Sequence, residues 1–197
     1  MAVEYELKFQ ATPEVLSAIC HSIPEAATRY EMETVYYDTP SGALSARYYT
    51  LRCRRENDLH VCTLKTPAKD GRNETELSCD NIHDALDALC EASSIEDLKD
   101  ILKEGIVPVC GARFTRIAKT LDIAGGTVEL ALDQGVLMGG GKEIPLCEVE
   151  VELKSGSIQA AQIYGAALAL KFNLKPQPKS KFQRALALGK GDSHGAL

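Results

Sequence analysis

The sequence lacks the features on which several common functions depend. Its four histidines are scattered, and none of its seven cysteines forms a Cys-x-x-Cys pair, so the clustered ligands of a zinc site are absent. It contains no apolar run long enough to cross a bilayer, and no membrane partner is expected. Its net charge is −6, whereas a general nucleic-acid binder needs a basic surface, so no nucleic-acid partner is expected either.

The cysteines are odd in number, and no secretory signal is present. We therefore expect reduced, buried thiols in a cytoplasmic protein. Hydrophobic residues make up 45% of the 197 residues and charged residues 25%, which is an ordinary globular balance. This predicts a single domain over residues 1–188, followed by a small, polar tail, residues 189–197, that we expect to fray.

What the sequence does have is charge at alternate positions of short apolar segments. Residues i, i+2 and i+4 of a strand share one face, so the Glu148, Glu150 and Glu152 side chains would lie opposite those of Val149 and Val151. Each such segment predicts a strand with one charged and one apolar face. There are five of them: Glu4-x-Glu6-x-Lys8, Arg52-x-Arg54, Glu74-x-Glu76, Glu129-x-x-x-Asp133 and Glu148-x-Glu150-x-Glu152.

Together with the turn signals between them, these segments predict an α+β fold with about eight strands, mostly antiparallel. For one segment, an open sheet facing water explains the pattern. For five together, we expect helices to cover the apolar faces and a closed, water-filled barrel to enclose the charged ones, because burying so many unpaired charges costs too much. The strands are expected at 3–10, 27–38, 49–56, 59–66, 72–79, 109–123, 126–133 and 144–153, and helices after Thr12 and over 81–91, 95–103, 158–171 and 179–188.

A charged interior of this kind has a definite chemical use. Carboxylates hold hard divalent cations, and the side chains of arginine and lysine hold phosphate oxygens. The alternative for the basic residues is cross-strand ion pairing with the same carboxylates. Both can hold, because an empty tunnel would satisfy its charges with such pairs.

An ordered set of motifs resembles the CYTH domain, or triphosphate tunnel metalloenzyme, superfamily. The signature Glu-x-Glu-x-Lys of that family stands at Glu4, Glu6 and Lys8. The resemblance covers residues 1–188 and implies an eight-stranded antiparallel tunnel with helices packed outside, a substrate bearing a triphosphate, and Mg²⁺ or Mn²⁺ as cofactor. The further motifs are Tyr-Tyr-Asp-Thr (36–39), Leu-Arg-x-Arg (51–54), Thr-x-Lys (63–65), Arg-x-Glu-x-Glu (72–76), Thr-Arg (115–116), Glu-x-x-x-Asp-x-Gly (129–135), Glu-x-Glu-x-Glu (148–152) and Ser-Lys (180–181) with Arg184.

The same resemblance implies roles for individual residues. Glu4, Glu6 and Lys8 would be catalytic, with Lys8 orienting or deprotonating the attacking water. The metal ligands would be Glu4, Glu6, Glu148 and Glu150, with Asp133, Glu74 and Glu76 as second-site or water ligands and Glu152 near the tunnel mouth. The phosphate chain would be held by Lys8, Arg52, Arg54, Lys65, Arg72, Arg116, Lys181 and Arg184.

Hydrolysis of inorganic tripolyphosphate is the expected function, because residues 132–135 and 146–150 resemble segments of bacterial inorganic triphosphatases. A class IV adenylate cyclase, which makes cyclic AMP from ATP, would need a base pocket that nothing in the sequence marks. A thiamine triphosphatase would need a wall for the thiamine rings, whereas tryptophan is absent and aromatic residues make up 6%. A non-catalytic polyphosphate- or nucleotide-binding module is a further alternative, although an anion binder gains nothing from so many inward acids. A homodimer is kept open as the oligomeric state.

Overall fold

The computed structural model describes residues 2–23 and 27–189. The tail that was expected to fray lies outside these residues, except for Gly189, which ends the last helix. The helices are α1 (Pro13–Ser22), α2 (Ala43–Ala46), α3 (Ile82–Ser93), α4 (Leu98–Ile101), the 3-10 helix η1 (Leu102–Glu104), α5 (Ile158–Phe172) and α6 (Lys181–Gly189). The strands are β1 (Ala2–Glu4), β2 (Glu6–Gln10), β3 (Thr28–Asp38), β4 (Thr50–Glu56), β5 (Leu59–Ala68), β6 (Gly71–Ser78), β7 (Val107–Ile123), β8 (Gly126–Gly139), β9 (Lys142–Gly156) and β10 (Lys175–Pro176).

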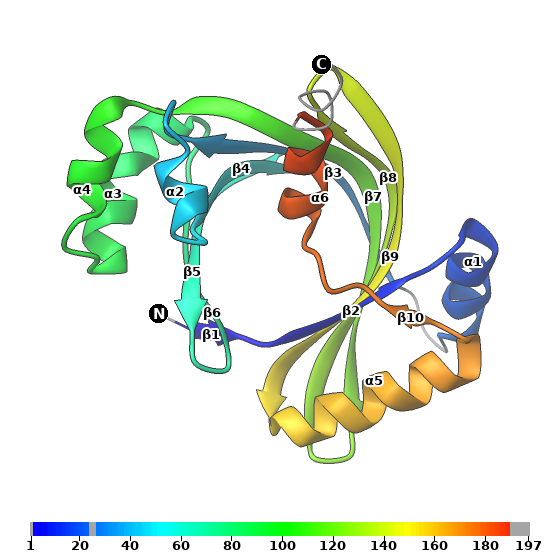
Figure 1. Ribbon diagram of the computed structural model, residues 1–197. Helices are drawn as coiled ribbons and strands as arrows, with labels where there is room; N and C mark the ends of the chain where they lie inside the picture. Colours follow the sequence, from blue (N-terminus) through cyan, green and yellow to red (C-terminus); the bar gives the residue numbers. More distant parts are fainter. Residues whose placement is uncertain (1, 24–26, 190–197) are drawn as a thin grey trace, which may run out of the picture.

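The N-terminal segment contacts both ends of a single antiparallel sheet. The strand order is β1-β6-β5-β4-β3-β7-β8-β9-β2-β10, and only Tyr5 separates β1 from β2 along the chain. Glu4 in β1 lies opposite Arg72 in β6, whereas Lys8 in β2 lies opposite Glu150 in β9. Residues 2–10 therefore pair with strands from both ends of the order, and the strands curve round a ring in Figure 1.

The predicted α+β class and antiparallel pairing are confirmed, but the sheet has ten strands rather than eight. The strand predicted over residues 3–10 is divided at Tyr5, where the chain leaves β6 and joins β9. β10 was not predicted, because two residues are too short to show an alternation. It pairs with Phe9 and Gln10 of β2.

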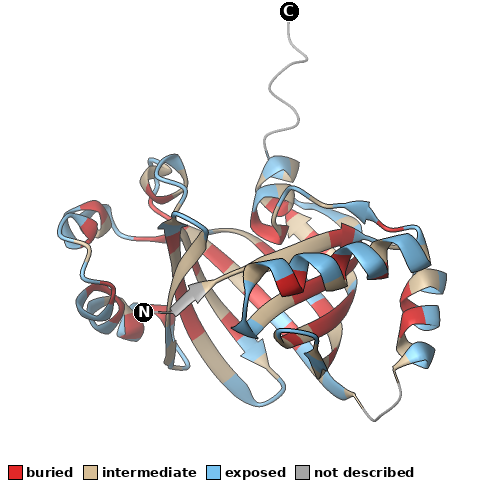
Figure 2. Cartoon of the chain, turned by 90° about the horizontal axis from the view of Figure 1, so that it is seen from below, coloured by how far each residue is buried: buried red, intermediate tan, exposed pale blue. Residues whose placement is uncertain are grey.

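The apolar faces of the strands are covered by helices, as their alternation predicts. Val149 and Val151 of β9 are fully buried and share one apolar cluster with Leu16 and Ile19 of α1 and Leu168 of α5. A second cluster places α3 and α4 over β4 and β5. Buried and exposed positions alternate along helices and strands in Figure 2. Within the two described ranges, no helix is both long and apolar enough to span a membrane.

Helix α6 departs from the expectation that the helices pack outside. Its first residues line the cavity on the charged faces of the strands, and Figure 1 shows it projecting toward the centre of the ring. Ala185 is fully buried against Leu137 and Leu146 of β8 and β9. A Cβ atom at Gly139 would lie 2.1 Å from the Ala185 carbonyl oxygen, so only glycine at this position lets the helix approach so closely. The helical pattern alone could not show which surface α6 covers.

The Tyr-Tyr-Asp-Thr motif ends β3 with a structural carboxylate. Asp38 is 2% exposed, and its two carboxylate oxygens accept hydrogen bonds from the backbone N–H groups of Thr39, Leu44 and Ser45 at 2.8, 2.9 and 3.1 Å. The bonds from Leu44 and Ser45 satisfy N–H groups in the first turn of α2, which have no partner within the helix, and the bond from Thr39 fixes the turn after β3. Asp38 thus fixes α2 to the end of β3.

Candidate functional site

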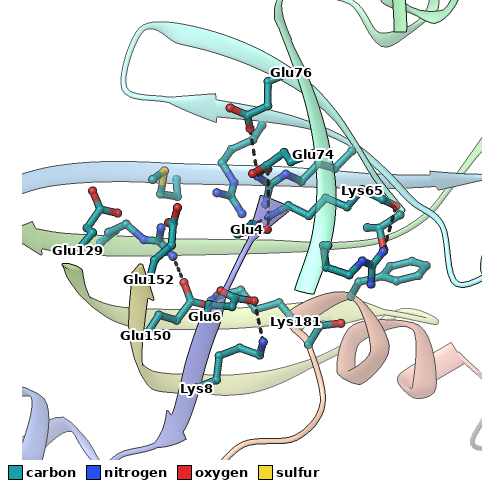
Figure 3. A pocket seen from close by; sticks show the side chains of 18 of the residues that line it. Glu4, Glu6, Lys8, Lys65, Glu74, Glu76, Glu129, Glu150, Glu152 and Lys181 are labelled. Carbon is teal, nitrogen blue, oxygen red and sulfur yellow. Dashed lines mark hydrogen bonds and ion pairs between the residues drawn. The ribbon is translucent and has the colours of Figure 1, made fainter. Parts of the chain in front are cut away.

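The charged faces of the strands line a cavity of about 510 Å³. Eight carboxylates and eight basic side chains line it, so at neutral pH the charges of the lining balance. Glu6, Lys8, Glu150 and Glu152 come from two adjacent strands, and Figure 3 shows their side chains converging with those of Glu4 and Lys65 on the same space. The charged lining residues are Glu4, Glu6, Glu56, Glu74, Glu76, Glu129, Glu150, Glu152, Lys8, Arg52, Arg54, Lys65, Arg72, Arg116, Lys154 and Lys181.

The structure brings most of the predicted site residues together in this lining. Three of them, Asp133, Glu148 and Arg184, are not lining residues; Asp133 and Glu148 are buried on the cavity face of the sheet, where residues of α6 pair with them. The lining also contains two charged residues that sequence reasoning passed over, Glu56 and Lys154. A third, Glu129, was recognised as part of an alternating segment but was given no role. Its signal was its position four residues before Asp133, which places both side chains on one face of β8.

At the first turn of α6, three carboxylates form a compact group, of which Glu150 also lines the cavity. Oxygen atoms of Asp133, Glu148 and Glu150 lie within 4.8 Å of one another. The Lys181 Nζ atom is 2.7 Å from oxygens of both Asp133 and Glu150 and forms an ion pair with Glu148. Arg116 donates two 2.8 Å hydrogen bonds to Asp133 and a third to Glu150, and Arg184 pairs with Glu148. We call Asp133, Glu148 and Glu150 the buried triad.

The electrostatics of the buried triad are set by burial and by these cations. Burial, reinforced by the neighbouring Glu150 carboxylate, raises the pKa of Glu148, against the opposing effect of Lys181. Burial would also raise the pKa of Glu150, but Lys181 and Arg116 outweigh it and lower that pKa well below its usual range. Three cations thus match three carboxylates. The three carboxylates could hold a divalent ion if it took the place of the Lys181 ammonium group among them.

A second row of acids faces the cavity. Glu152 of β9 lies opposite Glu6 of β2 on one side and Glu129 of β8 on the other. Lys8 is 2.7 Å from Glu6, and Lys154 is 2.9 Å from Glu152. Burial raises the pKa of Glu152, and the charges of Glu4 and Glu129 add to that effect while Lys154 opposes it. Carboxylates that face a cavity can serve as ligands of a hard divalent cation, which takes oxygen ligands, once their lysine partners move aside. We call Glu4, Glu6, Glu129 and Glu152 the acidic row.

The opposite side of the cavity pairs acids with basic residues. The Lys65 Nζ atom is 2.5 Å from Glu4 and 3.0 Å from Glu74, and Arg52 is 3.6 Å from both Glu74 and Glu76 (Figure 3). Cross-strand ion pairing is the role that the sequence analysis gives as the alternative to phosphate binding, and these pairs link β1 with β4, β5 and β6. Glu4 therefore belongs both to the acidic row and to this paired group.

Two arginines keep hydrogen-bonding capacity for an anion. Arg54 is 5% exposed; its Nε atom donates to the Thr34 hydroxyl at 2.9 Å, and its ion pair with Glu56 is long, 3.7 Å. Burial lowers the pKa of Arg54 to about 10, with the charges of Arg52 and Arg116 adding to the effect. The Nε atom of Arg52 is buried and has no hydrogen-bond partner among residues 2–23 and 27–189. A phosphate oxygen would satisfy such donors.

The comparisons with known proteins agree with this fold. A model of the CYTH domain family matches residues 2–186, and the chain therefore belongs to the CYTH domain family. Enzymes of this family are mostly metal-dependent triphosphatases. An inorganic triphosphatase of Haemophilus influenzae is 25% identical over 200 residues, which cover 96% of this chain and 56% of that protein. The chain thus spans little more than half the length of this curated relative.

Solved structures share the fold at low sequence identity. A Hippeastrum protein, described as a candidate adenylyl cyclase with a dominant triphosphatase activity, is 16% identical with a TM-score of 0.68, covering 96% of each chain. A Bacillus halodurans protein described as a candidate adenylate cyclase is 18% identical with a TM-score of 0.66, covering 92% of this chain and 96% of that one. A Pyrococcus horikoshii protein is 21% identical with a TM-score of 0.63, covering 94% and 99%. At these identities the likeness concerns the fold alone.

Proposed function

We propose that the protein hydrolyses a triphosphate in a divalent-metal-dependent reaction, and that the substrate is inorganic tripolyphosphate. The observation that carries the proposal is the balanced lining of the cavity, eight carboxylates against eight cations. A triphosphate carries several negative charges, so its entry into a neutral cavity requires added positive charge. Divalent cations on the acidic row would supply that charge, and the freed basic residues would then bind phosphate oxygens.

We take the sheet to form a closed, water-filled tunnel. The pairing of residues 2–10 with β6 through β1 and with β9 through β2 supports this closure. The protein wall lowers the effective dielectric around the charged groups and strengthens their interaction with a bound anion. Helix α6 would cover one side of the lumen, since Lys181 and Phe182 line the cavity.

We place the Mg²⁺ or Mn²⁺ on the acidic row rather than in the buried triad, because Lys181 pairs with all three acids of the triad, whereas each lysine beside the row pairs with one of its acids. The row, formed by Glu4, Glu6, Glu129 and Glu152, offers oxygen ligands that face the cavity. Glu74 and Glu76, which also line the cavity, would serve a second ion. When bound, the ion would act as a Lewis acid on the phosphate oxygens. Glu148 and Glu150, expected as ligands from the sequence, would instead hold Lys181 and Arg116 in position.

The basic residues of the chain would bind and polarise the phosphate groups. Arg52 and Arg54 follow each other on one face of β4, and Arg116 reaches the cavity from β7. Guanidinium groups fixed in this way stabilise charge that develops on phosphoryl oxygens in the transition state. They need little reorganisation, because Arg116 is already held by its bonds to Asp133.

Lys8 would act as a fixed cation rather than as a base. Burial alone would lower the pKa of Lys8, but the ion pair with Glu6 and the more distant Glu150 and Glu148 raise it above its usual value. An amine with a raised pKa stays protonated at neutral pH. Of the two roles expected for Lys8, orienting water or phosphate is therefore supported, and removing a proton is not.

Two observations support tripolyphosphate as the substrate. The relative from Haemophilus influenzae is an inorganic triphosphatase, and the similarity extends over 96% of this chain. Two of the aromatic rings in the lining, Tyr36 and Phe182, contact each other at a centroid distance of 5.2 Å, so they are engaged with each other rather than placed for a base or a thiamine ring.

The test is a product assay with purified protein and Mg²⁺ or Mn²⁺, in which tripolyphosphate, ATP and thiamine triphosphate are offered in parallel. We expect the fastest phosphate release from tripolyphosphate and no release without a divalent ion. Formation of cyclic AMP and pyrophosphate from ATP would identify a cyclase instead. Tight, metal-dependent binding without turnover of any of the three would identify a binding module and contradict the proposal.

A further inference from the structure

Two cysteines face each other on neighbouring strands, on the side of the sheet away from the cavity. Cys53 in β4 lies directly opposite Cys62 in β5, and their sulfur atoms are 3.1 Å apart. On β4, Cys53 stands between Arg52 and Arg54, both of which line the cavity. Because strand residues alternate between faces, the thiols are turned outward, and they lie in the apolar cluster beneath α3.

The position of this pair suits a disulfide. Directly opposite residues of an antiparallel pair have Cα atoms about 4.5–5.5 Å apart, which falls within the range found for disulfides, about 4.4–6.8 Å. A bond length of about 2.05 Å requires the two sulfur atoms to approach by only about 1 Å. The Cys79 carbonyl oxygen accepts hydrogen bonds from both thiols, at 3.9 Å from Cys53 and 3.3 Å from Cys62, and this holds them side by side.

The two thiols differ in their access to an oxidant. Cys53 is partly exposed, whereas Cys62 is completely buried. Burial, together with the adjacent Cys53, raises the pKa of Cys62, so Cys62 reacts slowly with an external reagent, whereas a mixed disulfide at Cys53 lies within direct reach of its sulfur. Cys53 is therefore the thiol that meets an external reagent first, and Cys62 is the thiol that resolves the product.

We propose that Cys53 and Cys62 are a reversible oxidation site that reacts with a small-molecule disulfide such as oxidised glutathione. The Cys53 thiolate attacks one glutathione sulfur, forming a mixed disulfide and releasing one glutathione thiolate, which takes up the proton that Cys53 lost. Cys62 then attacks the Cys53 sulfur, the Cys53–Cys62 bond forms, and a second glutathione leaves with the proton from Cys62. Two protein thiols are oxidised, and one glutathione disulfide is reduced to two glutathiones.

The consequence is a covalent tie between β4 and β5 directly behind Arg52 and Arg54. The tie closes a short hairpin loop, Cys53 to Cys62, so its effect on the unfolded chain is moderate. We expect the melting temperature of the oxidised protein to rise by about 5 °C. This modification is independent of which triphosphate the cavity accepts.

The test oxidises the reduced, full-length protein with glutathione disulfide and maps the products by mass spectrometry without reduction. Cleavage at Arg54 and Arg55 separates the two cysteines into different peptides. We expect a linked pair of peptides containing Cys53 and Cys62, five remaining titratable thiols of the original seven, and full reversal by dithiothreitol. Seven remaining thiols, a mixed disulfide that persists, or a bond from Cys53 to Cys79 would overturn the proposal.

Two variants separate the attacking from the resolving thiol. Cys62→Ser removes only the resolving sulfur, so we expect Cys53 to accumulate as the mixed disulfide with glutathione. Cys147→Ser is the matched control, because Cys147 is a partly exposed cysteine on β9, and the Cys53–Cys62 bond should form in it as in the unchanged protein. The mapping of the unchanged protein decides the proposal even if a variant folds poorly. Loss of the Cys53–Cys62 bond in Cys147→Ser would contradict it.

Discussion

Replacement of Lys181 by methionine would leave the buried triad with three carboxylates and two cations. Lys181 is 5% exposed and contacts all three acids, so the variant keeps the volume of the side chain and loses the charge at the centre of the group. Removal of one partner from a buried ion pair costs about 3–5 kcal/mol. For a protein of this size, each kcal/mol lowers the melting temperature by about 2–4 °C, so we expect a decrease of about 6–20 °C.

The loss should depend on pH with a definite sign. In the unchanged protein the pKa of Glu150 is lowered, so its contribution to stability is present above the ordinary pKa of a glutamate and is lost as the pH falls through the lowered folded-state value. In Lys181→Met, burial acts on Glu148 and Glu150 without the lysine. Their folded-state pKa values rise, and the variant loses stability as the pH rises through them. The difference between the two proteins should therefore be larger near pH 8 than near pH 5.

The assay is urea unfolding followed by circular dichroism at both pH values, with Lys179→Met as control, since Lys179 is exposed and two residues away.

A divalent ion could take the vacated place between the carboxylates, so Mn²⁺ should raise the melting temperature of Lys181→Met more than that of the control. Equal stability of the two variants, or a difference that grows toward acid pH, would refute this account of the buried triad.

Two further predictions concern α2 and the acidic row. Asp38→Ala leaves three backbone N–H groups without their acceptor. It should lower the free energy of unfolding, measured by urea titration, by about 2–4 kcal/mol and leave phosphate release per folded molecule unchanged. The control is Asp70→Ala, because Asp70 is an exposed turn residue. Because the pKa of Glu152 is raised, metal-dependent kcat/KM should fall with decreasing pH earlier, at a higher pH, than it would for an ordinary glutamate. We call this fall the acid limb of the pH profile. Lys154→Met removes the cation that opposes the rise in pKa, so it should move the acid limb to still higher pH.

Each of these predictions has a result that would contradict it. If Asp38→Ala unfolds at the same urea concentration as Asp70→Ala, the three hydrogen bonds do not hold α2. If the acid limb of kcat/KM stays in place in Lys154→Met, Glu152 does not control metal-dependent turnover.

The alternation of charged and apolar residues was enough to predict which side chains of a strand share a face. In β9 it separated Glu148, Glu150 and Glu152 from the fully buried Val149 and Val151, because strand geometry repeats every two residues. The same rule groups Glu129 with Asp133 on β8, although it does not show that Glu129 lines the cavity. Local pattern also predicted most strand boundaries, since turns with Gly, Pro, Asn and Asp interrupt the alternation.

Alternation could not predict depth or long-range partners. Glu148, Glu150 and Glu152 look equivalent in the sequence, yet Glu148 is fully buried and paired with two cations from α6, while Glu152 faces the cavity. The partners Lys181 and Arg184 lie more than thirty residues along the chain from Glu148, on a helix whose pattern does not show where it docks. The division of the acids into a buried triad and an acidic row therefore required the tertiary structure.

The measurement that tests the central claim most directly is phosphate release from tripolyphosphate by Glu6→Gln, titrated with Mn²⁺. Glu6 lies opposite Glu152 in the acidic row, and glutamine preserves its size while removing the charge that would hold the ion. Glu143→Gln, an exposed position outside the cavity, is the matched control. We predict that Glu6→Gln stays folded but loses metal-dependent turnover, while Glu143→Gln keeps it. Full, Mn²⁺-dependent activity in Glu6→Gln would contradict the account.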